Sequence, residues 1–128
     1  MLTKDELTTL IADFCARLGR LIANGVPLVS ALEAIAAENS GQPGFQLMLT
    51  HMVQSIEIGH TLASSMMNYS LFPETLITAI MNAEQKGTLD VALQTLSPSI
   101  MKGDFPLGTL PPEDSLHLND IHSEMETI

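Results

Sequence analysis

The sequence of 128 residues contains no tryptophan, few aromatic side chains and a single cysteine. Aromatic residues make up only 4% of the chain, which argues against an aromatic-rich β-sandwich. The lone Cys15 cannot form an internal disulfide, and no basic segment followed by an apolar run and a cleavage site opens the chain. Together these absences argue against secretion and favour a cytosolic setting.

Basic residues are also scarce, with five Lys and Arg against 15 Asp and Glu and a formal net charge of −10. Nucleic acids are bound through clustered Lys and Arg side chains, so DNA or RNA binding is not expected, and anionic membrane surfaces are disfavoured for the same reason. The most apolar stretch, residues 10–22, includes Asp13, Arg17 and Arg20. Because a membrane span needs about 20 nearly uncharged residues, we expect a soluble chain.

Apolar residues recur at steps of three and four along residues 1–98, which is the spacing of amphipathic helices. The first helix is expected to begin at a capping box formed by Thr3 and Glu6 and to end at Gly25. Pro27 suits the first turn of a second helix, which is expected to run to about residue 39 and to form a tight hairpin with the first.

Four further helices are expected after the turn residues 39–44. They are one from residue 45 until Gly59, a short one from the cap Thr61 to Met67, one opened by Pro73 and closed by Gly87, and one from the cap Thr88 to Pro98. Their short connections imply antiparallel neighbours. The sequence therefore predicts an all-α fold, a compact antiparallel bundle of about six helices.

Charge density divides the chain near Pro98. Residues 1–98 and residues 99–128 each carry a net charge of −5, although the second part is less than a third of the length. The second part has too few apolar positions to offset the entropy of ordering, so we expect a folded domain over 1–98 and an acidic, mostly disordered tail over 99–128. A short helix over about 112–125 stays open, because Leu116, Ile121 and Met125 partly keep helical spacing.

A repeat architecture is one alternative. The pairs Gly25–Leu28 and Gly59–Leu62 lie 34 residues apart, which is the period of tetratricopeptide repeats with their concave peptide-binding surface. Fewer than three such units would fit in the chain, and the aromatic and small-residue positions of that repeat do not recur.

Several motifs occur in a fixed order across about 85 residues of the chain. They are Phe14 and Leu18; the turn Asn24-Gly25-Val26-Pro27-Leu28; Gly59 and Leu62; Leu71-Phe72-Pro73; and Ala83, Glu84, Gly87 and Leu89. This series resembles the cytoplasmic domain of the type II secretion system F family, the inner-membrane platform proteins of type II secretion and type IV pilus assembly. Ala83 departs from the glycine usual at its position in that family.

The resemblance implies a non-enzymatic scaffold on the cytoplasmic side of the inner membrane that contacts the assembly ATPase and neighbouring platform subunits. It also implies self-association, so a homodimer is expected, with membrane contact only indirect, through partners. Full members carry two copies of the domain and three membrane spans. We therefore interpret the single copy here either as a soluble piece of the first cytoplasmic domain or, with a slight preference, as a standalone relative.

A second functional class is a soluble adaptor or regulator. In that interpretation, a groove of the bundle binds a peptide or a helix, and the acidic tail competes for a basic partner surface.

No catalytic residue, metal ligand or cofactor site is predicted. Cys15 lies on the apolar face of the first helix, so we interpret it as a core residue. His51 and His60 are isolated, and His117 and His122 are five residues apart rather than the three or four that would place two ligands on one helix face.

Two acidic residues flank the Gly87 turn. Glu84 and Asp90 could act as an acid–base pair or bind a cation, but a capping or solvated role is favoured for both. Met66 and Met67 stay open between filling a gap and facing a partner, and together with these two acids they are the candidate partner interface. Three other methionines are expected to fill gaps between helices, namely Met48, Met52 and Met81.

Overall fold

The computed structural model describes residues 2–112, and within them it contains six helices and no strand. The helices are α1 (Lys4–Ala23), α2 (Leu28–Glu38), α3 (Pro43–Glu57), α4 (Leu62–Met66), α5 (Glu74–Lys86) and α6 (Leu89–Met101). The prediction of an all-α bundle of about six helices is confirmed.

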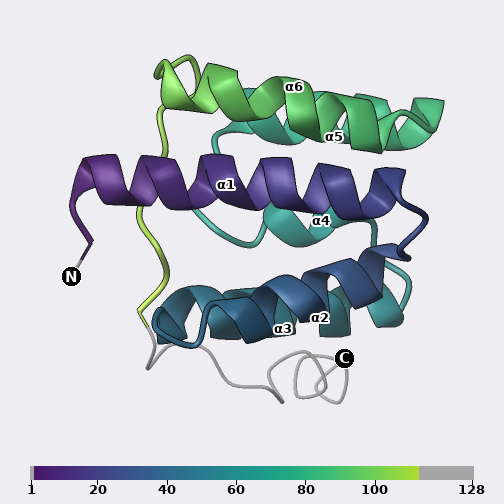
Figure 1. The fold of residues 1–128 in the computed structure, drawn as a ribbon, viewed down its shortest axis with the longest axis horizontal. Helices are drawn as coiled ribbons and strands as arrows, with labels where there is room; N and C mark the ends of the chain where they lie inside the picture. The colour runs from purple at the N-terminus through teal and green to yellow at the C-terminus, as the bar shows by residue number, and fades with distance from the viewer. Residues whose placement is uncertain (1, 113–128) are drawn as a thin grey trace.

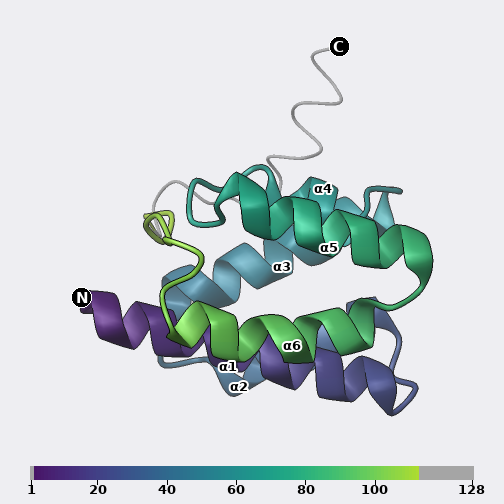
Figure 2. The ribbon, with the colours of Figure 1, turned by 90° about the horizontal axis from the view of Figure 1, so that it is seen from above.

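The helices are arranged as a closed ring. Each helix contacts the next one along the chain, and α6 returns to contact α1, which is the most extensive helix pair in the described part of the chain. In Figure 1, α5 and α6 form the upper layer, α1 and α4 the middle layer, and α2 and α3 the lower layer. Figure 2, seen from above, places α6, α1 and α2 on one side and α5 and α4 on the other. Because the ring closes, the bundle is not an open stack of repeats.

The first helix begins as its sequence predicts. The Thr3 hydroxyl accepts the Glu6 backbone N–H at 3.1 Å, and the Glu6 carboxylate accepts the Thr3 backbone N–H at 2.9 Å. This reciprocal pair satisfies two backbone donors that have no partner within the helix. At the far end, Gly25 adopts a φ of +88° and allows the chain to turn toward α2.

Helices α1 and α6 run antiparallel and approach closely at one glycine. A Cβ atom on Gly19 would lie 2.9 Å from the Asp90 carbonyl oxygen and 3.1 Å from the Leu93 Cβ. Farther along the pair, the Ser97 hydroxyl donates to the Ala12 carbonyl oxygen at 2.7 Å. The absence of a side chain at residue 19 thus lets the backbones of the two helices come together.

The last helix continues past the residue at which we expected it to end. Pro98 lies inside α6, which runs on to Met101. Proline removes one backbone donor near the end of the helix, while Ile100, one turn beyond the hydrogen-bonded Ser97, is fully buried. Packing of this last turn against the bundle outweighs the proline, so the predicted boundary at residue 98 is wrong for the helix.

Residues 103–112, here called the C-terminal strap, also differ from the expected disordered tail. Figure 1 shows this segment descending from the end of α6 past α1 toward the start of α3. Phe105, Leu107 and Leu110 are partly buried and pack against the core, and the Gly108 N–H donates to the Leu71 carbonyl at 2.9 Å. The remainder of the expected tail, including most of the possible helix over 112–125, lies outside the described residues.

Candidate interaction surfaces

The motif residues that carry the resemblance set turns and fill the core. Leu18 and Leu62 are fully buried, and Phe14 meets Phe45 edge to face with ring centroids 5.8 Å apart. The other motif side chains are similarly structural: Phe72 is buried, Leu28 and Leu89 pack partly buried against the core, and Pro27 and Pro73 directly precede α2 and α5. Gly25, Gly59 and Gly87 all have positive φ at helix ends. These positions therefore determine the shape of the bundle.

Glu84 caps a helix other than its own. Its carboxylate oxygens accept the backbone N–H groups of Leu62 and Ala63, each at 2.9 Å, at the start of α4. The Thr61 hydroxyl accepts the Ser64 N–H at the same helix end. A negative charge is favourable there, because unsatisfied N–H groups concentrate positive potential at the start of a helix. Of the two roles weighed for this residue, the geometry shows capping, and it links α5 to α4.

Asp90 lies on the other side of the Gly87 turn, in the first turn of α6. It is partly exposed, and no hydrogen bond joins its carboxylate to that of Glu84 in the described structure. An acid at this place is favourable next to the helix start. The structure therefore does not bring these two residues together as a pair.

The methionines separate into a buried and an exposed set. Met48 and Met52 are fully buried, as gap-filling residues are. Met66 is also fully buried, so its predicted place in a partner interface is wrong: the apolar face of α4 turns it into the core. Met67 is 67% exposed. Met81 is 41% exposed, so the expectation that it fills a gap is wrong as well.

Most of the exposed large apolar side chains lie in the second half of the described sequence. Met67, Met81, Val91 and Met101 all follow α4 in sequence, whereas Ile58 stands alone at the end of α3. Val91, at 61% exposure, was not predicted. The signal for it was that Val91 lies off the stripe formed by Leu89, Leu93 and Leu96. Single exposed apolar side chains are common on protein surfaces, whereas a contiguous apolar patch marks an interaction site.

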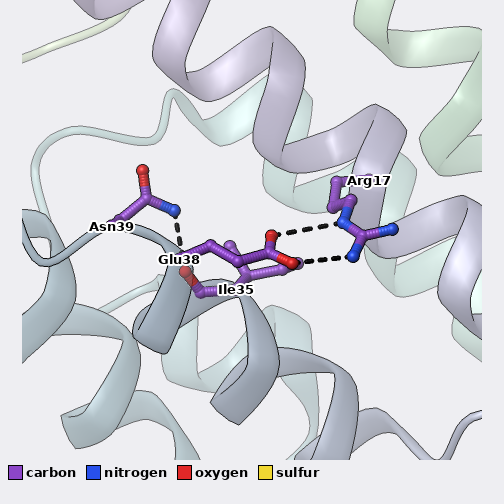
Figure 3. A network of polar contacts seen from close by, with 4 residues as sticks. All are labelled: Arg17, Ile35, Glu38 and Asn39. Carbon is purple, nitrogen blue, oxygen red and sulfur yellow. Dashed lines mark hydrogen bonds and ion pairs between the residues drawn. The ribbon is translucent and has the colours of Figure 1, made fainter.

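A second surface feature lies between α1 and α2. Arg17 donates to both carboxylate oxygens of Glu38, from Nε at 3.2 Å and from Nη2 at 2.7 Å. Figure 3 shows this bidentate contact, with Asn39 nearby. The pair raises the pKa of Arg17 and lowers that of Glu38. The pair lines a groove of about 420 Å³, together with Phe14 and Ile35 among others. The contact fastens the end of α2 to the middle of α1.

The nucleophilic and aromatic titratable groups are held in the core. Burial raises the pKa of the Cys15 thiol to about 12, so Cys15 is neutral and inert at physiological pH, in agreement with its interpretation as a core residue. The Tyr69 hydroxyl lies 2.9 Å from Nδ1 of His51, and burial raises the pKa of Tyr69 to about 12. This contact places His51 against the α4–α5 connection, which its isolation in the sequence did not indicate.

Two further observations concern residues 2–112. No group of three or more His, Cys, Asp or Glu side chains in this part of the chain is arranged to hold a metal ion. None of its helices combines the length and the apolarity that crossing a membrane requires.

The motif residues of this closed helical ring are turn glycines, a cross-helix cap and core side chains. A family model described as "Type II secretion system (T2SS), protein F" matches residues 14–103. The chain belongs to this family of secretion platform proteins, as the motif series predicted. A comparison with curated proteins gives no match.

Proposed function

We propose that this chain is a non-enzymatic scaffold domain of a type II secretion or type IV pilus assembly platform. In this role it contacts the assembly ATPase and other platform subunits at the cytoplasmic face of the inner membrane. The observation that carries the proposal is the family match over residues 14–103. The placement of the motif side chains supports it, because they hold the helices in position instead of lining a reaction centre.

We place the partner contact on the outer surface of α5 and α6. Met81 and Val91 expose apolar surface there, and Asp90 adds a carboxylate beside Val91. Met67, just after α4, belongs to the same half of the chain. An apolar centre with an acidic neighbour fits a partner that offers an apolar patch with basic residues at its edge.

Self-association is a further part of the proposal. Apolar patches on a domain surface can also pair two copies, and a two-fold interface uses the same patch on both. Light scattering of the purified chain over a range of concentrations measures this directly, and a Val91→Asp variant that stays monomeric would place the dimer contact on α6.

The test of the platform role is an affinity pull-down of the tagged full chain from its host lysate, with mass spectrometry of the retained proteins. We expect an assembly ATPase or platform subunits, and we expect Val91→Asp to lose them. Ile58→Asp is the matched control, because Ile58 is also exposed but lies at the end of α3. Retention of only unrelated cytosolic proteins would contradict the platform role and favour a soluble adaptor.

A further inference from the structure

Two grooves meet along the outer side of α1, beside the passage of the chain from α2 to α3. One, of about 410 Å³, follows the first half of α1, and the other, of about 420 Å³, follows its second half. Leu10 and Asp13 line both. Together they form one depression that extends along the helix from Leu2 to Arg20, here called the α1 groove.

Apolar side chains line the α1 groove beside its charged ones. Leu2 and Leu10 are partly exposed in it, and the buried Phe14, Ile35 and Phe45 also contribute to its lining. Residues 2–112 contain no strand, so an extended peptide finds no sheet edge there to pair with. The mode of recognition that suits a groove between helices is an amphipathic helix that inserts apolar side chains spaced three and four apart.

The free charges of the α1 groove are separated along α1. Asp5 and Asp13 are exposed, and neither carboxylate forms an ion pair within the described residues. Arg17 is engaged by Glu38, which leaves Arg20 as the cation of this groove that has no ion pair in the described part of the chain. The α1 groove is therefore negative toward the start of α1 and positive at its far end.

A helix that matches this pattern carries basic residues at one end and an acidic residue at the other. Asp5 and Arg20 are separated by 15 positions in α1, or about 22 Å at a rise of 1.5 Å per residue, so a helix of about 15 residues spans them. Lys and Arg stabilise the last turn of a helix, and acids its first turn. The matching helix therefore ends beside Asp5 and Asp13, begins beside Arg20, and runs antiparallel to α1.

The acidity of this chain disfavours its own segments as occupants. Residues 99–128 carry a net charge of −5, and a second copy of the chain brings a formal net charge of −10. Either would add like charge next to Asp5 and Asp13, which opposes association. A basic segment of another protein meets the opposite sign at the same place.

We propose that the α1 groove binds a basic amphipathic helix of a partner protein, antiparallel to α1. Among the described residues, none from α5 or α6 lines this groove. The contact is thus separate from the partner surface placed on those two helices, and both surfaces can be occupied at once. The proposal goes beyond the platform role and does not depend on it.

The test is a titration of the full chain, followed by nuclear magnetic resonance, with a synthetic 15-residue probe. The probe has leucines spaced three and four apart, a glutamate in its first turn and lysines in its last turn. We expect the backbone amide signals of Thr9 and Ala16 to shift, because both residues line the α1 groove. No binding, or shifts confined to α5 and α6, would overturn the proposal.

A charge reversal distinguishes binding in the groove from general attraction to an acidic protein. Asp13→Lys should weaken probe binding about fivefold or more, because an attractive charge pair becomes a repulsive one. Glu57→Lys makes the same change in net charge at an exposed position at the end of α3, outside the groove, and should leave the affinity within about twofold. Equal weakening by the two variants would overturn the proposal.

A nitroxide on the last residue of the probe tests the orientation. It should broaden the signals of Asp5 and Thr9 and leave that of Arg20 sharp, and the reverse pattern would overturn the antiparallel arrangement. A dilution series of the chain without the probe tests the competing occupant. Shifts of Thr9 and Ala16 that grow with the concentration of the chain itself would show that a second copy fills the groove, against the proposal.

Discussion

The Glu84 carboxylate accepts the backbone N–H of Leu62 at 2.9 Å, across 22 residues of sequence. The same carboxylate accepts the next N–H, that of Ala63. α4 has only five residues, too few to be stable alone. The contact from α5 is therefore part of what holds the short helix in the ring.

Removal of the Glu84 carboxylate should destabilise the fold. In Glu84→Ala two backbone donors lose a charged acceptor, and we expect the free energy of unfolding to fall by about 1–3 kcal/mol. Glu84→Gln should lose less, since its amide oxygen can still accept one bond. Urea denaturation measures both, with the exposed neighbour Gln85→Ala as the control; an unchanged midpoint in Glu84→Ala would contradict the role of the cap.

The close approach at Gly19 should tolerate no side chain. In an isolated helix Gly→Ala is favourable by about 1 kcal/mol. Here the new Cβ would lie 2.9 Å from the Asp90 carbonyl oxygen, a backbone atom that cannot rotate away. We therefore expect Gly19→Ala to lower the free energy of unfolding by about 1–3 kcal/mol. Thermal unfolding measures whether Gly19→Ala lowers or raises the stability. A stabilised variant would show that α1 and α6 can move apart at no cost in stability.

The strap should detach in Gly108→Ala. The overlap with the Ser70 carbonyl forces the segment away from the α4–α5 connection, and with it Leu107 leaves the core. We expect faster proteolytic cleavage within 103–112 while α1–α6 stay intact. Gly41→Ala serves as the control, because a Cβ atom there meets nothing within 4 Å; equal cleavage of the two variants would argue against a bound strap.

The Arg17–Glu38 contact should make a small contribution that depends on pH. Arg17 lowers the pKa of Glu38 below its ordinary value of 4.5, so the contribution is present above that value and is lost as the pH falls through the lowered pKa. Because both side chains are solvent-exposed, we expect only a slight loss of thermal stability in Arg17→Gln at neutral pH. This difference from the unsubstituted chain should disappear in strong acid and shrink in high salt. Arg20→Gln, which removes an arginine with no ion pair in the described structure, should show no such pH dependence.

Most helix ends could be predicted because their signals are local. The capping box at Thr3, the αL turn at Gly87 and the Thr61 cap act within a few residues, and each is present in the structure. The end of α6 could not be predicted in this way. Pro98 is a local stop signal, but burial of Ile100 in the core of the bundle outweighs it.

The surface residues were harder to predict than the core. Met66 and Met67 are neighbours with the same chemistry, yet one is fully buried and the other is 67% exposed. Helical spacing alone could not decide between them, because α4 is too short to define a stripe. For Glu84 the sequence indicated a capping or solvated role, but it could not indicate that the residue caps α4.

By itself the sequence determined the fold class, the family and most helix boundaries of this protein. It is an all-α domain of the type II secretion system F family with glycine and threonine at its helix ends. These features depend on spacing and on backbone preferences of single residues. Only the tertiary structure decided that α6 closes the ring on α1 at Gly19, that Glu84 caps α4, and that the strap packs along the bundle. Each of these is a contact between segments far apart in the chain, whose energy depends on how the helices approach in space.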